Sequence, residues 1–201
     1  MFPVNVPNVL TVLRILLVPV LVVALLDQTP NGDLLAAIVF AVASMTDAVD
    51  GWLARRRQSI TTFGKLMDPL ADKLLVIGTL IPLQGLGLVP AWVVVAIVAR
   101  ELAVTNLRAI ASARGYSVGA SASGKVKTIF QTLSAAGLLL LLVVPSLPLA
   151  YLVYSLLSAA VALTIFSGVD YLWKASFAIA GRGVPERWRL PQRSGARTRA
   201  R

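Results

Sequence analysis

The chain has no cysteine and no histidine among its 201 residues. Without cysteine there is no disulfide framework, no thiol nucleophile and no thiolate metal site. Without histidine, imidazole serves neither as a metal ligand nor as a general base. Metal or acid–base chemistry must therefore depend on the carboxylates of aspartate and glutamate, with lysine or tyrosine as weaker alternatives for a base.

Charged residues are also scarce. They make up 14% of the chain, whereas hydrophobic residues make up 57% and the mean hydropathy is +0.80. A soluble domain usually carries about 25% charged residues. This composition excludes an ordinary soluble domain, and because no polar linker divides the apolar part, we expect one membrane domain over residues 1–182.

Six segments approach the ~20 apolar residues that a membrane-spanning helix needs. Proline, glycine and asparagine punctuate the connections between them. The sequence therefore predicts an all-α integral membrane protein with six transmembrane helices. The segments are residues 8–26, 34–54, 66–85, 90–112, 125–144 and 149–173.

The basic residues of the connections predict the orientation of these helices. Connections 27–33, 83–90 and 144–149 contain no lysine or arginine. Because basic connections stay on the cytoplasmic side, the other connections and both termini are expected to be cytoplasmic. Those alternate connections contain Arg55, Arg56, Arg57, Lys65 and Arg114.

The C-terminal segment is strongly basic. Residues 174–201 carry eight lysines or arginines against one acid, Glu186. Next to membrane spans, such a segment favours anionic lipid headgroups over nucleic acid. We expect residues 183–201 to be a flexible cytoplasmic tail, with anionic membrane lipids and not nucleic acid as its partner.

Four of the nine acidic residues fall within 26 positions, at Asp47, Asp50, Asp68 and Asp72. Asp47 and Asp50 are three residues apart and Asp68 and Asp72 four apart, so each pair shares a helix face. Asp47 and Asp72 each lie eight residues, or about 12 Å along the axis, from the cytoplasmic end of their segment. The four carboxylates are therefore expected to converge at similar depth.

Converging carboxylates in a low-dielectric site require cations to neutralise them. Hard divalent ions with oxygen ligands, Mg²⁺ or Mn²⁺, suit this donor set, and a pair of them suits phosphoryl transfer. Gly51, Ala54 and Gly64 lie on the same helix faces and leave space for a diphosphate. One such aspartate could serve helix packing alone, but packing does not account for four acids on two helices.

The four aspartates and the small residues near them fit a longer sequence pattern. Its spacing is D-x2-D-G-x2-A-R-x8-G-x3-D-x3-D, and through it the chain resembles the CDP-alcohol phosphotransferases. The resemblance implies a six-helix membrane enzyme that acts as a homodimer. Such enzymes transfer a phosphatidyl or similar group from a CDP-linked donor to an alcohol and release CMP. The matching residues are Asp47, Asp50, Gly51, Ala54, Arg55, Gly64, Asp68 and Asp72.

The resemblance also implies roles for single residues. Asp47, Asp50 and Asp68 resemble ligands of two Mg²⁺ or Mn²⁺ ions, and Asp72 resembles a general base that also lies near a metal. For Asn8 and Thr11, an ordinary helix N-cap remains the alternative. The implied CDP-donor contacts are Asn8, Thr11, Asp50, Gly51, Ala54, Arg55 and Gly64.

The alcohol acceptor depends on a closer resemblance. The stretches NVPNVLTVLRI, FGKLMDPLADKLLV, ARELAVTNLR and GKVKT, within residues 5–145, look like phosphatidylglycerophosphate synthases. This implies that glycerol 3-phosphate attacks the β-phosphorus of CDP-diacylglycerol at the cytoplasmic face of the inner cell membrane. The acceptor phosphate is expected to contact Arg108, Lys125 and Lys127, and more weakly Arg100.

Other assignments remain open. The same basic residues could form a structural Arg–Glu pair and lysines that extend to the membrane surface. A cardiolipin synthase or a phosphatidylinositol-phosphate synthase would share the aspartate motif. A cation transporter is a remote alternative, because the outward halves LLAAIVFAV and LLVIGTLIPL carry no charge.

Overall fold

The computed structural model describes the backbone of residues 6–57, 62–113 and 122–180, and the side chains of 9–46, 71, 73–113, 124, 126–173 and 176. Within this part of the chain every regular element is an α-helix, which confirms the all-α prediction and its six helices. In chain order they are α1 (Val6–Leu26), α2 (Pro30–Arg57), α3 (Thr62–Gly85), α4 (Ala91–Ala113), α5 (Ala122–Val143) and α6 (Leu147–Ala180).

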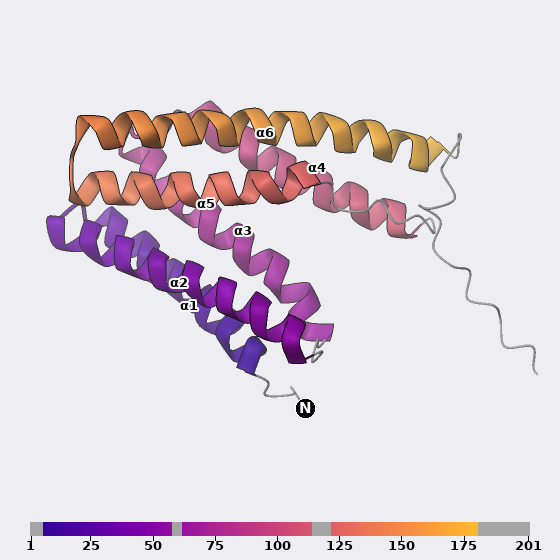
Figure 1. The fold of residues 1–201 in the computed structure, drawn as a ribbon, viewed down its shortest axis with the longest axis horizontal. Coiled ribbons are helices and arrows are strands. Elements are labelled where there is room, and N and C mark those ends of the chain that lie inside the picture. Colours follow the sequence, from indigo (N-terminus) through magenta and orange to yellow (C-terminus); the bar gives the residue numbers. More distant parts are fainter. Residues whose placement is uncertain (1–5, 58–61, 114–121, 181–201) are drawn as a thin grey trace, which may run out of the picture.

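The helices run up and down as three hairpins (Figure 1). The turns of the α1–α2, α3–α4 and α5–α6 hairpins gather at one end of the molecule, which we call the hairpin end. The N-terminus of α1 and the C-terminus of α6 lie toward the opposite end, which we call the open end (Figure 1). α1 packs against α2 and α3, α5 packs against α2 and α6, and α4 packs against α6.

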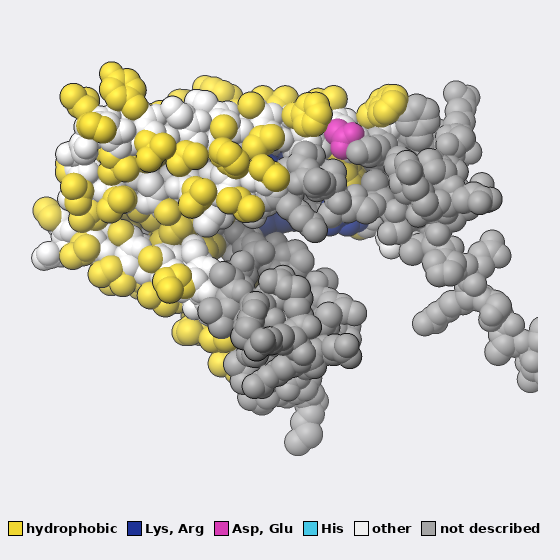
Figure 2. Space-filling view, viewed as in Figure 1, with side chains coloured by type: hydrophobic (Ala, Val, Ile, Leu, Met, Phe, Trp, Pro, Cys, Tyr) yellow, Lys and Arg dark blue, Asp and Glu magenta, His cyan; other side chains and the backbone are white. Residues whose placement is uncertain are grey.

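The surface of the helices is apolar. Large hydrophobic side chains such as Leu16 and Tyr151 are exposed, at 62% and 77%, and Figure 2 shows hydrophobic atoms over much of the described face. Three segments are long and apolar enough to cross a membrane: Val9–Leu26, Val126–Val143 and Leu147–Trp173. The protein is therefore a membrane protein.

Several helices are longer than the apolar segments that predicted them. α2 has 28 residues and α6 has 34. At ~1.5 Å per residue these helices are about 42 and 51 Å long, whereas the hydrocarbon core of a bilayer is about 30 Å thick. An apolar segment ends where contact with lipid ends, whereas the helix continues as long as its backbone hydrogen bonds continue, here into polar residues. The predicted segments 34–54 and 149–173 consequently stop short of the observed helix ends.

Local chemistry explains the tight turns at the hairpin end. Thr29 caps α2, because the backbone N–H of Gly32 donates to Thr29 Oγ1 at 3.1 Å and Pro30 occupies the first helical position. Gly32 is required for packing, since a Cβ there would lie 2.5 Å from the carbonyl oxygen of Ala24. Between α3 and α4, Gly87 adopts a φ of 76°, which suits glycine.

The main hydrophobic core lies in the half of the bundle near the hairpin end. Leu25, Leu83 and Leu138 are fully buried there. Gly137 of α5 lets α6 approach closely, because a Cβ at this position would lie 2.6 Å from Val153 Cγ2. In lipid, such close contacts replace the hydrophobic effect as the force that associates helices.

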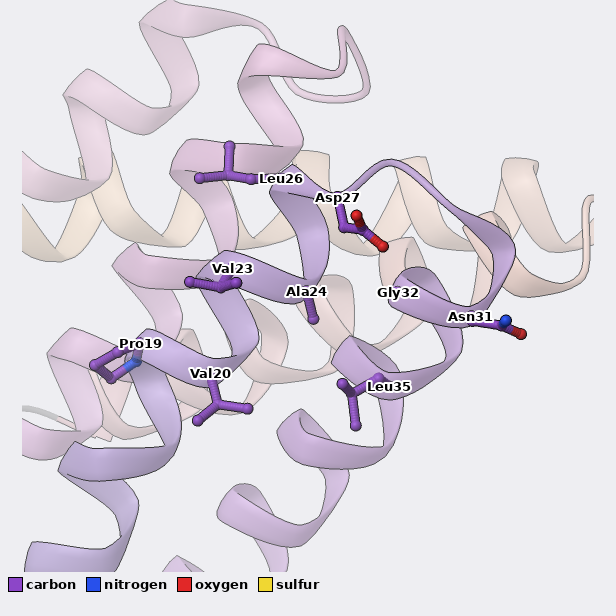
Figure 3. A pocket seen from close by; sticks show the side chains of 9 residues that line it. All are labelled: Pro19, Val20, Val23, Ala24, Leu26, Asp27, Asn31, Gly32 and Leu35. Atoms are coloured by element: carbon purple, nitrogen blue, oxygen red, sulfur yellow. The ribbon is translucent and has the colours of Figure 1, made fainter.

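A cavity of about 770 Å³ lies between α1 and α2 at the hairpin end (Figure 3). Its walls are mostly apolar, and Asp27 and Asn31 lie at its edge beside the turn. The aspartate motif begins at Asp47, in the other half of α2. This cavity is therefore separate from the predicted active site.

Candidate active site

The aspartate motif occupies the end of α2 and the start of α3. α2 ends at Arg57 and α3 begins at Thr62, so both motif segments belong to the open end, and the two helices contact each other. The side chains of the motif and of Asn8 are outside the described residues, and the metal and donor roles predicted for them stay predictions. These residues are Asn8, Asp47, Asp50, Gly51, Ala54, Arg55, Gly64, Asp68 and Asp72.

The backbone arrangement is compatible with the predicted metal centre. Asp47 and Asp50 are three residues apart in α2, and Asp68 and Asp72 are four apart in α3, so the two positions of each pair share one face by helical register. The two helices are in contact, and carboxylate oxygens are the ligands that Mg²⁺ and Mn²⁺ prefer. The residue types and their helix positions therefore fit a divalent-cation site.

The inward face of α1 changes character along its length. Leu21 and Leu25 are fully buried near the hairpin end, whereas Thr11 and Arg14, each 1% exposed, occupy the same face toward the open end. Thr11 was a predicted donor contact; Arg14 was missed, although it is the one charged residue in segment 8–26. α1 packs on both helices that carry the motif, and its polar half lies toward the open end, to which the motif segments also belong.

Glu101 of α4 is the centre of a buried charge cluster. Lys127 of α5 forms an ion pair with Glu101 Oε1. Arg100 donates from Nη1 to the same oxygen at 3.1 Å, and Lys73 Nζ lies 4.0 Å from Glu101 Oε2. Lys73 also donates a hydrogen bond to the hydroxyl of Thr105. The cluster thus joins α3, α4 and α5.

This cluster is poorly exposed to solvent. The side chain of Lys127 is 2% exposed, those of Arg100 and Glu101 are each 13% exposed, and that of Lys73 is 27% exposed. Among the described side chains, three cations surround one carboxylate. The described side chains of this cluster carry two more positive than negative charges, and because buried charges are stable when they are paired, this excess favours a bound anion.

Polar side chains of α6 extend the cluster. Arg100 donates from Nη2 to the hydroxyl of Ser167 at 3.1 Å. Gln131 of α5 donates from Nε2 to the hydroxyl of Thr164 at 3.0 Å. Thr164 in turn donates to the carbonyl oxygen of Ala160 at 2.6 Å. These bonds tie α6 to the charged helices and hold Arg100 in place.

A cavity of about 150 Å³ adjoins the cluster. At a liquid water volume of ~30 Å³ it would hold about five water molecules. Its walls combine the charged groups with hydroxyl, amide and aliphatic side chains. The lining residues are Lys73, Val76, Ile77, Ile97, Glu101, Lys127, Thr128 and Gln131.

Arg108 has a different environment from the other predicted acceptor contacts. Its guanidinium carbon lies 5.6 Å from the ring centroid of Tyr171 in α6, which is a cation–π distance. Tyr171 is 3% exposed and packs with Val104 and Ala111. Arg108 lies seven residues, or about 10 Å of helix, beyond Glu101 toward the open end.

The structure therefore brings together some of the predicted acceptor residues. Arg100 and Lys127 share Glu101, whereas Arg108 stacks on α6 and the side chain of Lys125 is outside the described residues. Sequence reasoning missed Lys73, although it directly follows Asp72 in the stretch that resembles the synthases. Its contacts with Glu101 and Thr105 depend on how α3 and α4 pack.

The sequence profile described as CDP-alcohol phosphatidyltransferase matches residues 4–172. The chain belongs to this family. The matched region includes all of the aspartate motif and most of α6, so the family assignment covers the two motif helices and the charge cluster alike. The phosphatidyltransferase motif and the membrane helices thus agree with the resemblance that the motif spacing indicated.

Curated relatives of this phosphatidyltransferase cover most of its length. A protein of Bacillus subtilis (strain 168) named CDP-diacylglycerol--glycerol-3-phosphate 3-phosphatidyltransferase is 40% identical over 185 residues, covering 85% of this chain and 94% of that protein. A Salmonella choleraesuis (strain SC-B67) protein of the same name is 35% identical over 173 residues, covering 84% and 93%. A Rickettsia bellii (strain RML369-C) protein, also of that name, is 38% identical over 136 residues, covering 68% and 75%.

Proposed function

We propose that this protein transfers the phosphatidyl group of CDP-diacylglycerol to glycerol 3-phosphate, giving phosphatidylglycerophosphate and CMP. The observation that carries the proposal is the 40% identity to a relative of that name across 94% of the relative's length. The complete motif, with Asp47 and Asp72 at its two ends, supports the same chemistry. The reaction belongs to phospholipid biosynthesis.

The reaction forms one P–O bond and breaks another. A hydroxyl oxygen of glycerol 3-phosphate bonds to the β-phosphorus of the donor, and the bond from that phosphorus to the CMP oxygen breaks. Asp72 accepts the hydroxyl proton as the new bond forms, which requires the carboxylate to lie within hydrogen-bond reach of the acceptor. CMP leaves with the bonding electrons of the broken bond.

Mg²⁺ or Mn²⁺, held by Asp47, Asp50, Asp68 and Asp72, would supply charge stabilisation for the diphosphate. The protein's own groups bind and orient the donor. Gly51, Ala54 and Gly64 leave room for the nucleotide, and Arg55 supplies a positive charge beside it. Asn8 and Thr11 of α1 complete the proposed donor contacts, and the burial of Thr11 against the motif helices is compatible with that role.

The charge cluster supports a phosphate monoester as the acceptor. A phosphate monoester carries about −1.5 to −2 charges at neutral pH, whereas the phosphodiester of a lipid carries about −1. Three described cations around Glu101 leave an excess of two positive charges, which a monoester dianion balances. We propose Lys127, Arg100, Arg108 and Lys125 as the acceptor contacts. This balance argues against phosphatidylglycerol as the acceptor.

We propose that the protein lies in the inner cell membrane with its open end facing the cytoplasm. We also propose that the enzyme acts as a homodimer. The basic residues Arg55, Arg56 and Arg57 at the end of α2 support the orientation through the positive-inside rule. Because the chain has no cysteine, single cysteines at Gln84 and Ser194 can be labelled in intact cells. The proposed orientation requires labelling at position 84 alone by an impermeant thiol reagent.

The acceptor is tested by one assay series on the purified protein. With Mg²⁺ and CDP-diacylglycerol, we expect CMP release and a new lipid when glycerol 3-phosphate is supplied. Inositol phosphate and phosphatidylglycerol serve as parallel acceptors. Turnover confined to either of these would disprove the proposed acceptor, while full activity in the presence of a strong chelator would contradict the proposed metal site.

A further inference from the structure

Lys73 lies where the motif helix meets the charge cluster. It follows Asp72 directly in α3, and its ammonium reaches across to α4, where it donates a hydrogen bond to Thr105. Lys73 and Lys127 both line the cavity of about 150 Å³, which they approach from different helices. This cavity is therefore bordered by the helix that carries the proposed base and by the helix that carries a proposed acceptor contact.

The contacts of Lys73 differ from those of the other two cations of the cluster. Glu101 Oε1 already receives both Lys127 and Arg100, whereas Lys73 lies 4.0 Å from the other carboxylate oxygen. Its hydrogen bond goes to a neutral hydroxyl. An ammonium has three N–H donors, so Lys73 has the capacity to bind an anion in the cavity while it keeps Thr105.

The remaining walls of the cavity suit a phosphate held against a hydrocarbon chain. Thr128 and Gln131 of α5 supply a hydroxyl and an amide, and Ile77 and Ile97 supply aliphatic surface. Val76 also lines the cavity and lies four residues after Asp72, one turn along α3. A phosphate bound here would therefore lie beside the segment of α3 that carries the proposed base.

We propose that Lys73 is a further acceptor-binding residue. With Lys127, it binds the phosphate monoester of the acceptor in this cavity and so selects a phosphorylated alcohol over an uncharged one. Glu101 and Thr105 are positioning residues, because Glu101 lies near both ammonium groups and Thr105 accepts a hydrogen bond from Lys73. This inference rests on the proposed function, because it assigns a phosphate subsite to that reaction.

The test compares Lys73→Met with Lys73→Arg in the full-length enzyme. Loss of a charged hydrogen bond is expected to raise the KM for glycerol 3-phosphate by about tenfold or more in Lys73→Met, with little change in the KM for CDP-diacylglycerol. Lys73→Arg keeps a positive charge that can donate to phosphate and should stay within about threefold of the wild type. Leu74→Ala, at the next position of α3, is the matched control, because Leu74 is 37% exposed and does not line the cavity, and it should leave this KM nearly unchanged.

A second measurement does not depend on turnover. Inorganic phosphate, compared with chloride at equal ionic strength, should raise the melting temperature of the wild type and of Lys73→Arg but not of Lys73→Met. An unchanged KM and an unchanged phosphate effect in Lys73→Met would overturn the inference and leave Lys73 as a counter-ion of Glu101. If wild-type enzyme used only a different phosphorylated acceptor, the proposed function would fail, and loss of the phosphate effect in Lys73→Met would still support the subsite.

Discussion

The two ends of the helix bundle bury different kinds of side chain on the same helix faces. In α1, Leu21 and Leu25 are buried toward the hairpin end, and Arg14 is buried toward the open end. In α5, Leu138 is fully buried in one half and Lys127 is 2% exposed in the other. The contrast indicates that the hairpin end holds the helices together by packing, while the open end uses the fixed helices to place charged groups.

Two groups of charged residues in the open half differ in what balances their charge. Lys127 and Arg100 both contact the carboxylate of Glu101, so the protein itself balances part of the charge of this cluster. The aspartate motif places Asp47, Asp50 and two further acids on two contacting helices, which predicts cations from outside the protein. The first cluster is thus only partly balanced by its own carboxylate and favours a bound anion, whereas the second is predicted to depend on bound cations.

The largest expected effect tests whether the aspartate motif at the open end carries out catalysis. Asp72→Asn should lower kcat by about 10³-fold, because the amide cannot accept the acceptor's proton. The melting temperature in detergent should change little, since removing a charge from a crowded acidic set relieves repulsion. Asp33→Asn, at the hairpin end of α2, is the control and should keep full activity. Normal turnover by Asp72→Asn would remove this residue as the base.

A smaller effect tests whether the open end also contributes to stability. Glu101→Ala removes the one described carboxylate among three cations and should destabilise the fold by about 3 kcal/mol, because buried positive charges lose their partner. Thermal unfolding in detergent measures this loss. Gln84→Ala, at an exposed site, is the control. An unaltered melting temperature would show that the cluster is not needed for stability.

The smallest expected effect tests the hairpin end. Leu138→Ala should destabilise the fold by about 2 kcal/mol, at the low end for such changes, because lipid is as apolar as the core and only packing is lost. The KM values for both substrates should be unchanged. The control is Leu140→Ala, since Leu140 is 48% exposed on the same helix and should change neither property. A selective rise in the KM for glycerol 3-phosphate with Leu138→Ala would break the division between the two ends.

Much of the fold could be predicted because short stretches of sequence determine where membrane helices form. Runs of about 20 apolar residues mark each span, and turn residues such as Thr29 and Gly87 mark the connections. Helix ends were less predictable, since α6 continues to Ala180, past the apolar run. The aspartate motif was also readable, because its spacing lies within two adjacent helices and one short connection.

The partners in the charge cluster could not be read in the same way. Lys127 is 26 residues from Glu101, and Lys73 is 32 residues from Thr105. The sequence suggested an acceptor pocket of Arg100, Arg108, Lys125 and Lys127, but helical spacing alone does not rank their contacts. The packing of α4 against α6 gives Arg108 a tyrosine neighbour and gives Arg100 a serine neighbour.

The sequence by itself determined that this protein is helical, lies in a membrane, and carries four carboxylates at spacings that fit a metal-dependent phosphatidyltransferase. Only the tertiary structure decided that Lys73, Glu101 and Lys127, from three different helices, border one cavity. The physical reason is the range of the forces involved. Backbone hydrogen bonding and hydropathy act along the chain, whereas the pairing of buried charges depends on which helices pack side by side.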